Sequence, residues 1–90
     1  MKRNFETEQY MRKFKEITGR TPMRCKLQKG SMKEFIFIEI EGTEEEYKNI
    51  QFYNDGYMFN NLFITFKDFN YYGGKDRIRF HILKEMLKWN

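Results

Sequence analysis

Small and reactive side chains are scarce in this sequence. The 90 residues include no alanine or valine, one proline, one cysteine and one histidine. The single cysteine, Cys25, excludes an internal disulfide and a zinc site built from several cysteines. The single histidine, His81, excludes a two-histidine metal site within one chain, and we expect no Ser/His/Asp or Cys/His catalytic arrangement. The sequence therefore predicts a binding protein rather than an enzyme.

Long apolar runs are also missing. The longest ones are too short to cross a bilayer. The residues after Met1 do not lead into the apolar segment that is typical of a signal peptide. We therefore expect a cytoplasmic protein that does not associate with membranes.

Two short motifs resemble ligand sites but lack the required pattern. Glu44, Glu45 and Glu46 are consecutive, so on a helix their side chains diverge and do not converge on one metal ion. The segment 73–75, Gly-Gly-Lys, lacks the full phosphate-binding loop pattern, and Asp76 beside it would repel an anion. We expect no metal and no cofactor.

Large side chains are abundant in place of the small ones. The chain has ten Phe, six Tyr, one Trp and six Met, and these must fill the thin core of one small domain, residues 1–90. Phe, Ile, Lys, Tyr and Asn, which have mostly A/T-rich codons, are all frequent. Such a composition is typical of small accessory proteins of bacteriophages and mobile elements, and we expect an origin of that kind.

Charge is unevenly distributed along the chain. The formal net charge is +4. Residues 1–33 and 57–90 are basic, whereas residues 34–56 contain seven acidic side chains and one lysine. This distribution fits either a bipolar surface or a surface on which the two signs pair.

A helix and a hairpin are predicted in the first half. Residues 5–18 have apolar side chains at helical spacing, and Gly19 followed by Pro22 is a stop signal. Two strand-like segments, 23–27 and 35–40, flank Gly30 and Ser31, which suit a two-residue turn. The register that this turn implies consists of the opposed pairs Lys29–Met32, Lys26–Phe35, Cys25–Ile36 and Arg24–Phe37.

The second half gives weaker signals. A short helix is expected after Thr43, which can cap it, with Glu46 at the third position. Residues 57–66 are strand-like, and two asparagines at 60–61 could divide them into a tight hairpin. Residues 70–74 are expected to form a loop. Residues 77–82 alternate as a strand would, but the helix propensity of 83–88 favours a C-terminal helix.

The predicted fold class is therefore α+β. We expect an antiparallel sheet of three to four strands, two main helices at the N- and C-terminal ends, and one short central helix.

Two surfaces are candidates for binding. The polar face of the hairpin combines cations with aromatic rings, an arrangement that can neutralise phosphates and stack bases. Its residues are Arg24, Lys26, Lys29, Lys33, Phe35 and Phe37. The predicted C-terminal helix carries a basic stripe that can contact phosphates. Its residues are Arg77, His81, Lys84 and Lys88. Each surface also has an ordinary structural explanation: a helix could cover the two phenylalanines, and the stripe could be a solvated helix face.

The function that these features favour is binding of RNA or single-stranded DNA. The alternative is a protein partner, with the chain acting as an inhibitor or adaptor, because interfaces are enriched in the aromatic residues, Met and Arg that are frequent here. A symmetric homodimer is a further expectation, since an exposed strand within 57–66 could pair across a two-fold axis.

Overall fold

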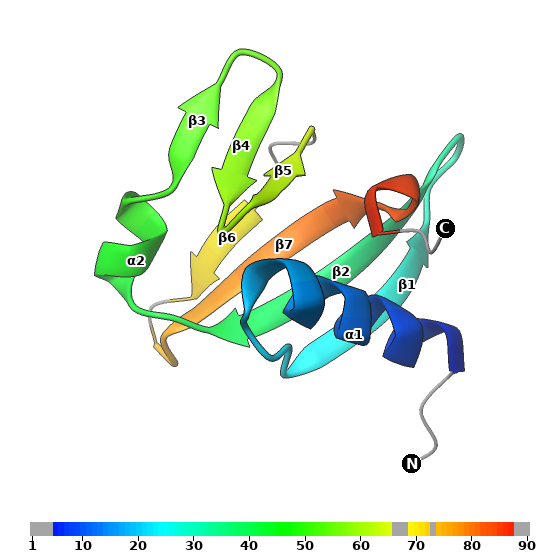
Figure 1. Ribbon diagram of the computed structural model, residues 1–90, viewed down its shortest axis with the longest axis horizontal. Coiled ribbons are helices and arrows are strands. Elements are labelled where there is room, and N and C mark those ends of the chain that lie inside the picture. Colours follow the sequence, from blue (N-terminus) through cyan, green and yellow to red (C-terminus); the bar gives the residue numbers. More distant parts are fainter. Residues whose placement is uncertain (1–4, 66–68, 73, 88–90) are drawn as a thin grey trace.

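The computed structural model describes residues 5–65, 69–72 and 74–87. The chain forms one long helix, one short helix, seven strands and a final 3-10 turn among these residues (Figure 1). The elements are α1 (Phe5–Thr18), β1 (Arg24–Lys29), β2 (Glu34–Glu41), α2 (Glu44–Lys48), β3 (Gln51–Tyr53), β4 (Gly56–Phe59), β5 (Leu62–Ile64), β6 (Phe69–Tyr72), β7 (Arg77–Leu83) and η1 (Lys84–Leu87).

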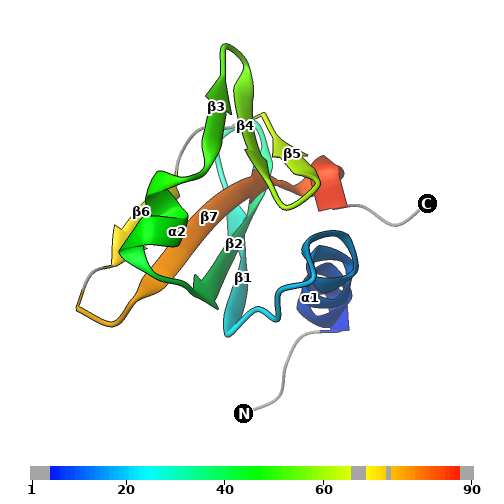
Figure 2. The same cartoon turned by 60° about the vertical axis from the view of Figure 1, so that its left-hand side comes forward.

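Two antiparallel sheets share one core. The main sheet has the strand order β1-β2-β7-β6, and the smaller sheet has the order β3-β4-β5. Helix α1 and the smaller sheet pack on the same face of the main sheet, here called the inner face (Figures 1 and 2). Phe80 on β7 lies at their junction, with its ring centroid 5.7 Å from that of Phe14 on α1 and 4.8 Å from that of Phe59 on β4.

Helix α1 forms where the sequence predicts it. Tyr10 and Phe14 are buried against the core, and Gly19 follows the helix with φ 76°, a left-handed conformation that glycine tolerates. The helix has 14 residues, and no helix in the described ranges is long and apolar enough to cross a membrane.

The first hairpin is confirmed, but its register is shifted by two residues. The turn contains four residues, 30–33, and the amide of Gly30 donates to the carbonyl of Lys33 at 2.8 Å. Cys25 therefore pairs with Ile38, and Lys26 pairs with Phe37. Because side chains alternate with a period of two, a shift of two residues leaves the side chains of residues 24–28 and 35–38 on their predicted faces.

The predicted C-terminal helix is wrong. Residues 77–83 form β7, which pairs with β2 over seven residues and with β6 on its other side. The strand buries Ile78, Phe80 and Ile82 on the inner face, whereas a helix would place Arg79 among apolar neighbours. Helix propensity prevails only in the short turn η1, where Leu87 is buried.

The middle of the chain contains more strand than predicted. The capped helix is confirmed, since the hydroxyl of Thr43 accepts from the amide of Glu46 at 3.2 Å. Residues 51–53 and 69–72, expected outside strands, form β3 and β6. The hairpin at Asn60 and Asn61 is confirmed, with φ of 42° and 71°. The α+β class holds, with a second sheet and without a second long helix. The homodimer through 57–66 stays a prediction.

Candidate functional site

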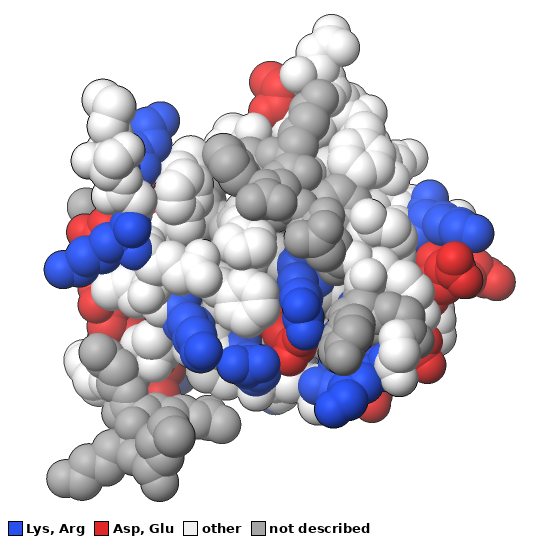
Figure 3. All heavy atoms as spheres, turned by 180° about the vertical axis from the view of Figure 1, so that it is seen from behind, with Lys and Arg blue, Asp and Glu red and all other residues white. Residues whose placement is uncertain are grey.

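The outer face of the main sheet is the surface of interest. It lies opposite α1 and the smaller sheet, and no described helix packs over it (Figures 1 and 2). In Figure 3, separate Lys and Arg side chains lie at both sides and along the lower part of this view, next to largely uncharged side chains. By strand register, the side chains on this face include Arg24, Lys26 and Gln28 from β1, Phe35, Phe37, Glu39 and the exposed Glu41 from β2, and Arg77, Arg79, His81 and Leu83 from β7.

One row across this face combines a cation with two rings. Lys26 pairs with Phe37, and Phe37 pairs with His81, so the three residues lie side by side on adjacent strands. The rings of Phe37 and His81 have centroids 5.3 Å apart and are tilted by 52°. Both are half-buried, and Lys26 is exposed. Half-buried rings keep part of their surface open for stacking by a planar ligand.

The adjacent row is centred on a buried carboxylate. Glu39 is only 3% exposed, and it lies between Arg24 on β1 and Arg79 on β7. The Nε of Arg79 donates to Glu39 Oε2 at 2.7 Å. Arg77 Nη1 and Arg24 Nη1 lie 3.7 Å and 4.0 Å from Glu39 Oε1. Three guanidinium groups therefore lie around one carboxylate, which attracts all three but does not neutralise their total charge.

This row lines a cavity of about 250 Å³, whose walls are Arg24, Glu39, Lys75, Arg77 and Arg79. Lys75 comes from the turn before β7 and is exposed. The lining carries four cations and one carboxylate, so its formal charge is +3. Such a cavity attracts anions.

Most of the predicted site residues do come together. The two surfaces that the sequence keeps apart are parts of one face, because β7 pairs with β2. This face contains Arg24, Lys26, Phe35, Phe37, Arg77 and His81. The covering helix considered for the two phenylalanines is absent from the described chain, and both rings are half-buried.

Three predicted cations, Lys29, Lys33 and Lys84, do not belong to this face. Lys29 is on β1 with inner-face parity, opposite Glu34, and Lys33 is in the turn. Lys84 is in η1, where its Nζ lies 2.9 Å from Glu6 Oε2 and 3.3 Å from Glu34 Oε2. Lys88 lies outside the described residues. A basic stripe through Lys84 is therefore wrong.

The ion pairs of Lys84 connect α1 to the sheet. Hydrogen bonding to Glu6 raises the pKa of Lys84 above its ordinary value, and the same bond lowers the pKa of Glu6. Each group therefore favours the charged form of the other. Lys84 has a structural role in holding α1, and this explains why it is unavailable to the outer face.

Sequence reasoning missed three members of the site: Glu39, Lys75 and Arg79. A signal existed for two of them. Arg79 alternates with Ile78 and Phe80, as an outward residue of a strand does, and Glu39 is the one acid within the apolar run 35–40. Lys75 had no such signal, because only the fold brings the turn to the ends of β1 and β2.

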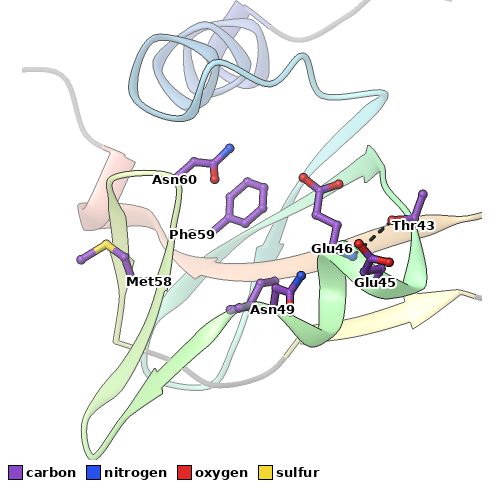
Figure 4. Close-up of a pocket in the computed structure, with 8 residues that line it drawn as sticks. Thr43, Glu45, Glu46, Asn49, Met58, Phe59 and Asn60 are labelled. Carbon is purple, nitrogen blue, oxygen red and sulfur yellow. Dashed lines mark hydrogen bonds between the residues drawn. The ribbon is translucent and has the colours of Figure 1, made fainter.

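A second cavity, of about 390 Å³, lies between α2 and the β4–β5 hairpin (Figure 4). Glu45 and Glu46 of α2 line it together with Asn49, which caps the end of α2, and Phe59 and Asn60 line it from the hairpin (Figure 4). It has acidic side chains and no basic ones, so it does not suit a polyanion. The described residues contain no cluster of three or more His, Cys, Asp or Glu side chains arranged to hold a metal ion.

Comparison with known proteins adds no relative: no protein-family model, no curated protein and no solved structure matches this chain. Any function must therefore be argued from the site itself.

Proposed function

We propose that the protein binds RNA or single-stranded DNA on the outer face of its main sheet. The observation that carries this proposal is the row Lys26–Phe37–His81, in which a cation and two half-buried rings lie on three neighbouring strands beside an arginine cluster. Unpaired bases stack on such rings, and phosphates between them contact the flanking cations.

The geometry favours a single strand over a duplex. Rings that project from the face of a sheet stack with bases only when those bases are unstacked and turned toward the protein. The described part of the outer face also presents no helix or projecting ribbon that could enter a major groove. The proposal is therefore for sequence-tolerant binding that depends on stacking and charge.

A protein partner is the second candidate, and a different surface supports it. The edge strand β3 carries Phe52 and Tyr53, which are 55% and 47% exposed. Exposed aromatic residues on a sheet edge are suited to pairing with another chain. This surface belongs to the smaller sheet and is separate from the cations of the outer face.

The proposal is tested by fluorescence anisotropy with a labelled single-stranded RNA of about 20 nucleotides, and with DNA of the same sequence, from about 50 to about 300 mM salt. We expect micromolar binding that weakens steeply with salt. Replacing Arg24 and Lys26 by Gln removes two cations, so the slope of log K against log salt should fall by about 1.4.

The matched control replaces Arg12 and Lys15, two exposed cations of α1, by Gln. It changes the net charge by the same amount on an element that packs against the inner face. Equal losses in both variants would mean that binding follows net charge alone. No binding at the lowest salt would end the nucleic-acid proposal and would direct attention to β3 and a protein partner.

A further inference from the structure

The arginine cavity has more hydrogen-bond donors than its carboxylate can accept. Each guanidinium group carries five N–H donors, and one carboxylate has about four acceptor positions for the three arginines around it. Glu39 accepts a hydrogen bond from Arg79 at 2.7 Å, while Arg24 and Arg77 lie at the longer distances of 4.0 Å and 3.7 Å. Donors are therefore left over, and the cavity can offer them to a second anion.

One of these donors is shielded from water. The Nε of Arg77 is buried and has no hydrogen-bond acceptor among the described residues. A buried donor without an acceptor is costly, and native structures normally provide a partner for it. A ligand with several oxygen acceptors would satisfy this group once the Arg77 side chain turns its Nε toward the cavity that it lines. This observation is independent of the net charge, and it indicates the same kind of ligand.

Lys75 adds a fourth cation to the lining of the cavity. It is exposed, and no ion pair involves it within the described part of the chain. Asp76, which the sequence suggests would repel an anion, is occupied elsewhere: its Oδ1 accepts from the Tyr71 hydroxyl at 2.5 Å. By register Tyr71 has inner-face parity, opposite Ile78, so this hydrogen bond draws the carboxylate away from the outer face.

We propose that Arg24, Lys75, Arg77 and Arg79 form a binding pocket for a phosphate dianion, with Glu39 as the residue that positions the arginines. A formal charge of +3 exceeds what one phosphodiester monoanion requires, and it suits a phosphomonoester, which carries almost two negative charges. The cavity of about 250 Å³ holds one phosphate group with room for its linkage.

On a nucleic acid, a phosphomonoester occurs only at a strand end. The Lys26–Phe37–His81 row adjoins the Arg24–Glu39–Arg79 row, so a terminal phosphate in the pocket would place the first base beside the rings. This assignment to a strand end rests on the proposed function. The pocket itself does not, because a small phosphorylated molecule would present the same dianion.

The test has two arms. In the first, inorganic phosphate is titrated into the isotope-labelled protein, and the arginine Nε–H signals are followed by NMR. We expect the signals of Arg77 and Arg79 to shift. In Lys75→Gln, the dissociation constant for phosphate that is read from this shift should rise about threefold or more. The control Lys15→Gln on α1 should leave the dissociation constant for phosphate unchanged. Absence of any shift at millimolar phosphate would contradict the proposal that this pocket binds phosphate.

In the second arm, one oligonucleotide is compared in 5′-phosphorylated, 3′-phosphorylated and unphosphorylated forms by anisotropy. We expect one end phosphate to tighten binding about tenfold, and Lys75→Gln to abolish that preference, measured in each protein as the ratio of the dissociation constants for the unphosphorylated and phosphorylated strands. Equal binding of the three forms would overturn the strand-end assignment and leave the proposed function standing.

The two proposals fail in distinguishable ways. If no oligonucleotide binds but inorganic phosphate shifts Arg77 and Arg79, the nucleic-acid proposal falls, and the pocket serves a small phosphorylated ligand. If oligonucleotides bind with a steep salt dependence but phosphate shifts nothing, the outer face binds strands without the pocket, and the pocket proposal falls.

Discussion

The two faces of the main sheet are made from alternate residues of the same strands, yet they hold opposite kinds of side chain. On β7, Ile78, Phe80 and Ile82 face inward and are fully buried, while Arg77, Arg79 and His81 face outward and are partly exposed. The inner face is closed by α1 and the smaller sheet, and the outer face is left open by the described elements. The inner face therefore accounts for stability, and the outer face is where a ligand has room.

The sharpest contrast between the faces concerns two phenylalanines on adjacent strands. Phe80→Ala removes a fully buried ring that contacts Phe14 and Phe59, so we expect a loss of about 3–5 kcal/mol in the free energy of unfolding. Phe37→Ala on the outer face should cost about 1 kcal/mol, because its ring is half-buried. Urea denaturation measures both. Equal losses would contradict the division between the faces.

Ligand affinity, unlike stability, should depend most on the outer face. Phe37→Leu keeps an apolar side chain on the sheet but removes the ring face, so affinity for single-stranded RNA should fall about 10-fold or more by anisotropy. Phe52→Leu, on the edge strand β3, is the matched control and should bind as the parent protein does. If Phe52→Leu has the larger effect, the site lies on the smaller sheet.

The arginine cluster should show whether charge on the outer face is also structural. Glu39→Gln leaves Arg24, Arg77 and Arg79 without their shared carboxylate, and we expect a loss of about 2 kcal/mol in the free energy of unfolding at low salt. The loss should shrink at high salt, where repulsion among the arginines is screened.

The control for that variant is Glu41→Gln, an exposed position two residues further along β2. It should change stability little. A Glu39→Gln protein as stable as the parent would mean that the carboxylate does not organise the cluster.

The smallest expected effect is a change in the pKa of Tyr71, whose hydroxyl donates a hydrogen bond to Asp76 in the turn that carries Lys75. The hydrogen bond to Asp76 raises the pKa of Tyr71 from 10.0 to about 12. A raised folded-state pKa adds stability that is fully present below pH 10 and is lost as the pH rises toward 12. Absorbance titration of the phenol should therefore give a higher pKa in the parent protein than in Asp76→Asn.

Asn suits position 76 because the backbone there has φ 51°, which Asn tolerates. An unchanged Tyr71 titration in this variant would mean that the Asp76 hydrogen bond does not hold the turn.

Local patterns predicted the elements that form through local interactions. Helix α1, the capped turn of α2 and the Asn60–Asn61 hairpin each follow from residues close together in the sequence. The outer-face parity of Arg24, Lys26, Phe35 and Phe37 was also predictable, since a two-residue error in register does not change the face.

Elements that depend on distant partners were not predicted. Residues 77–83 become a strand because β2, more than 35 residues earlier in the chain, offers an edge to pair with. The short strands β3 and β6 likewise exist only through their partners. The arginine cavity was missed for the same reason, because Lys75 and Glu39 approach each other only after β2 and β7 have paired.

The most direct test of the central claim asks which face of the sheet contacts a ligand. Side-chain NMR signals are followed while a single-stranded RNA of about 10 nucleotides is added to the labelled protein. If the ligand binds the outer face, the signals of Phe37, His81 and Arg79 shift together, while those of Phe14 and Phe52 do not. Shifts confined to α1 or β3, with Phe37 and His81 unchanged under saturating RNA, would contradict binding at the outer face.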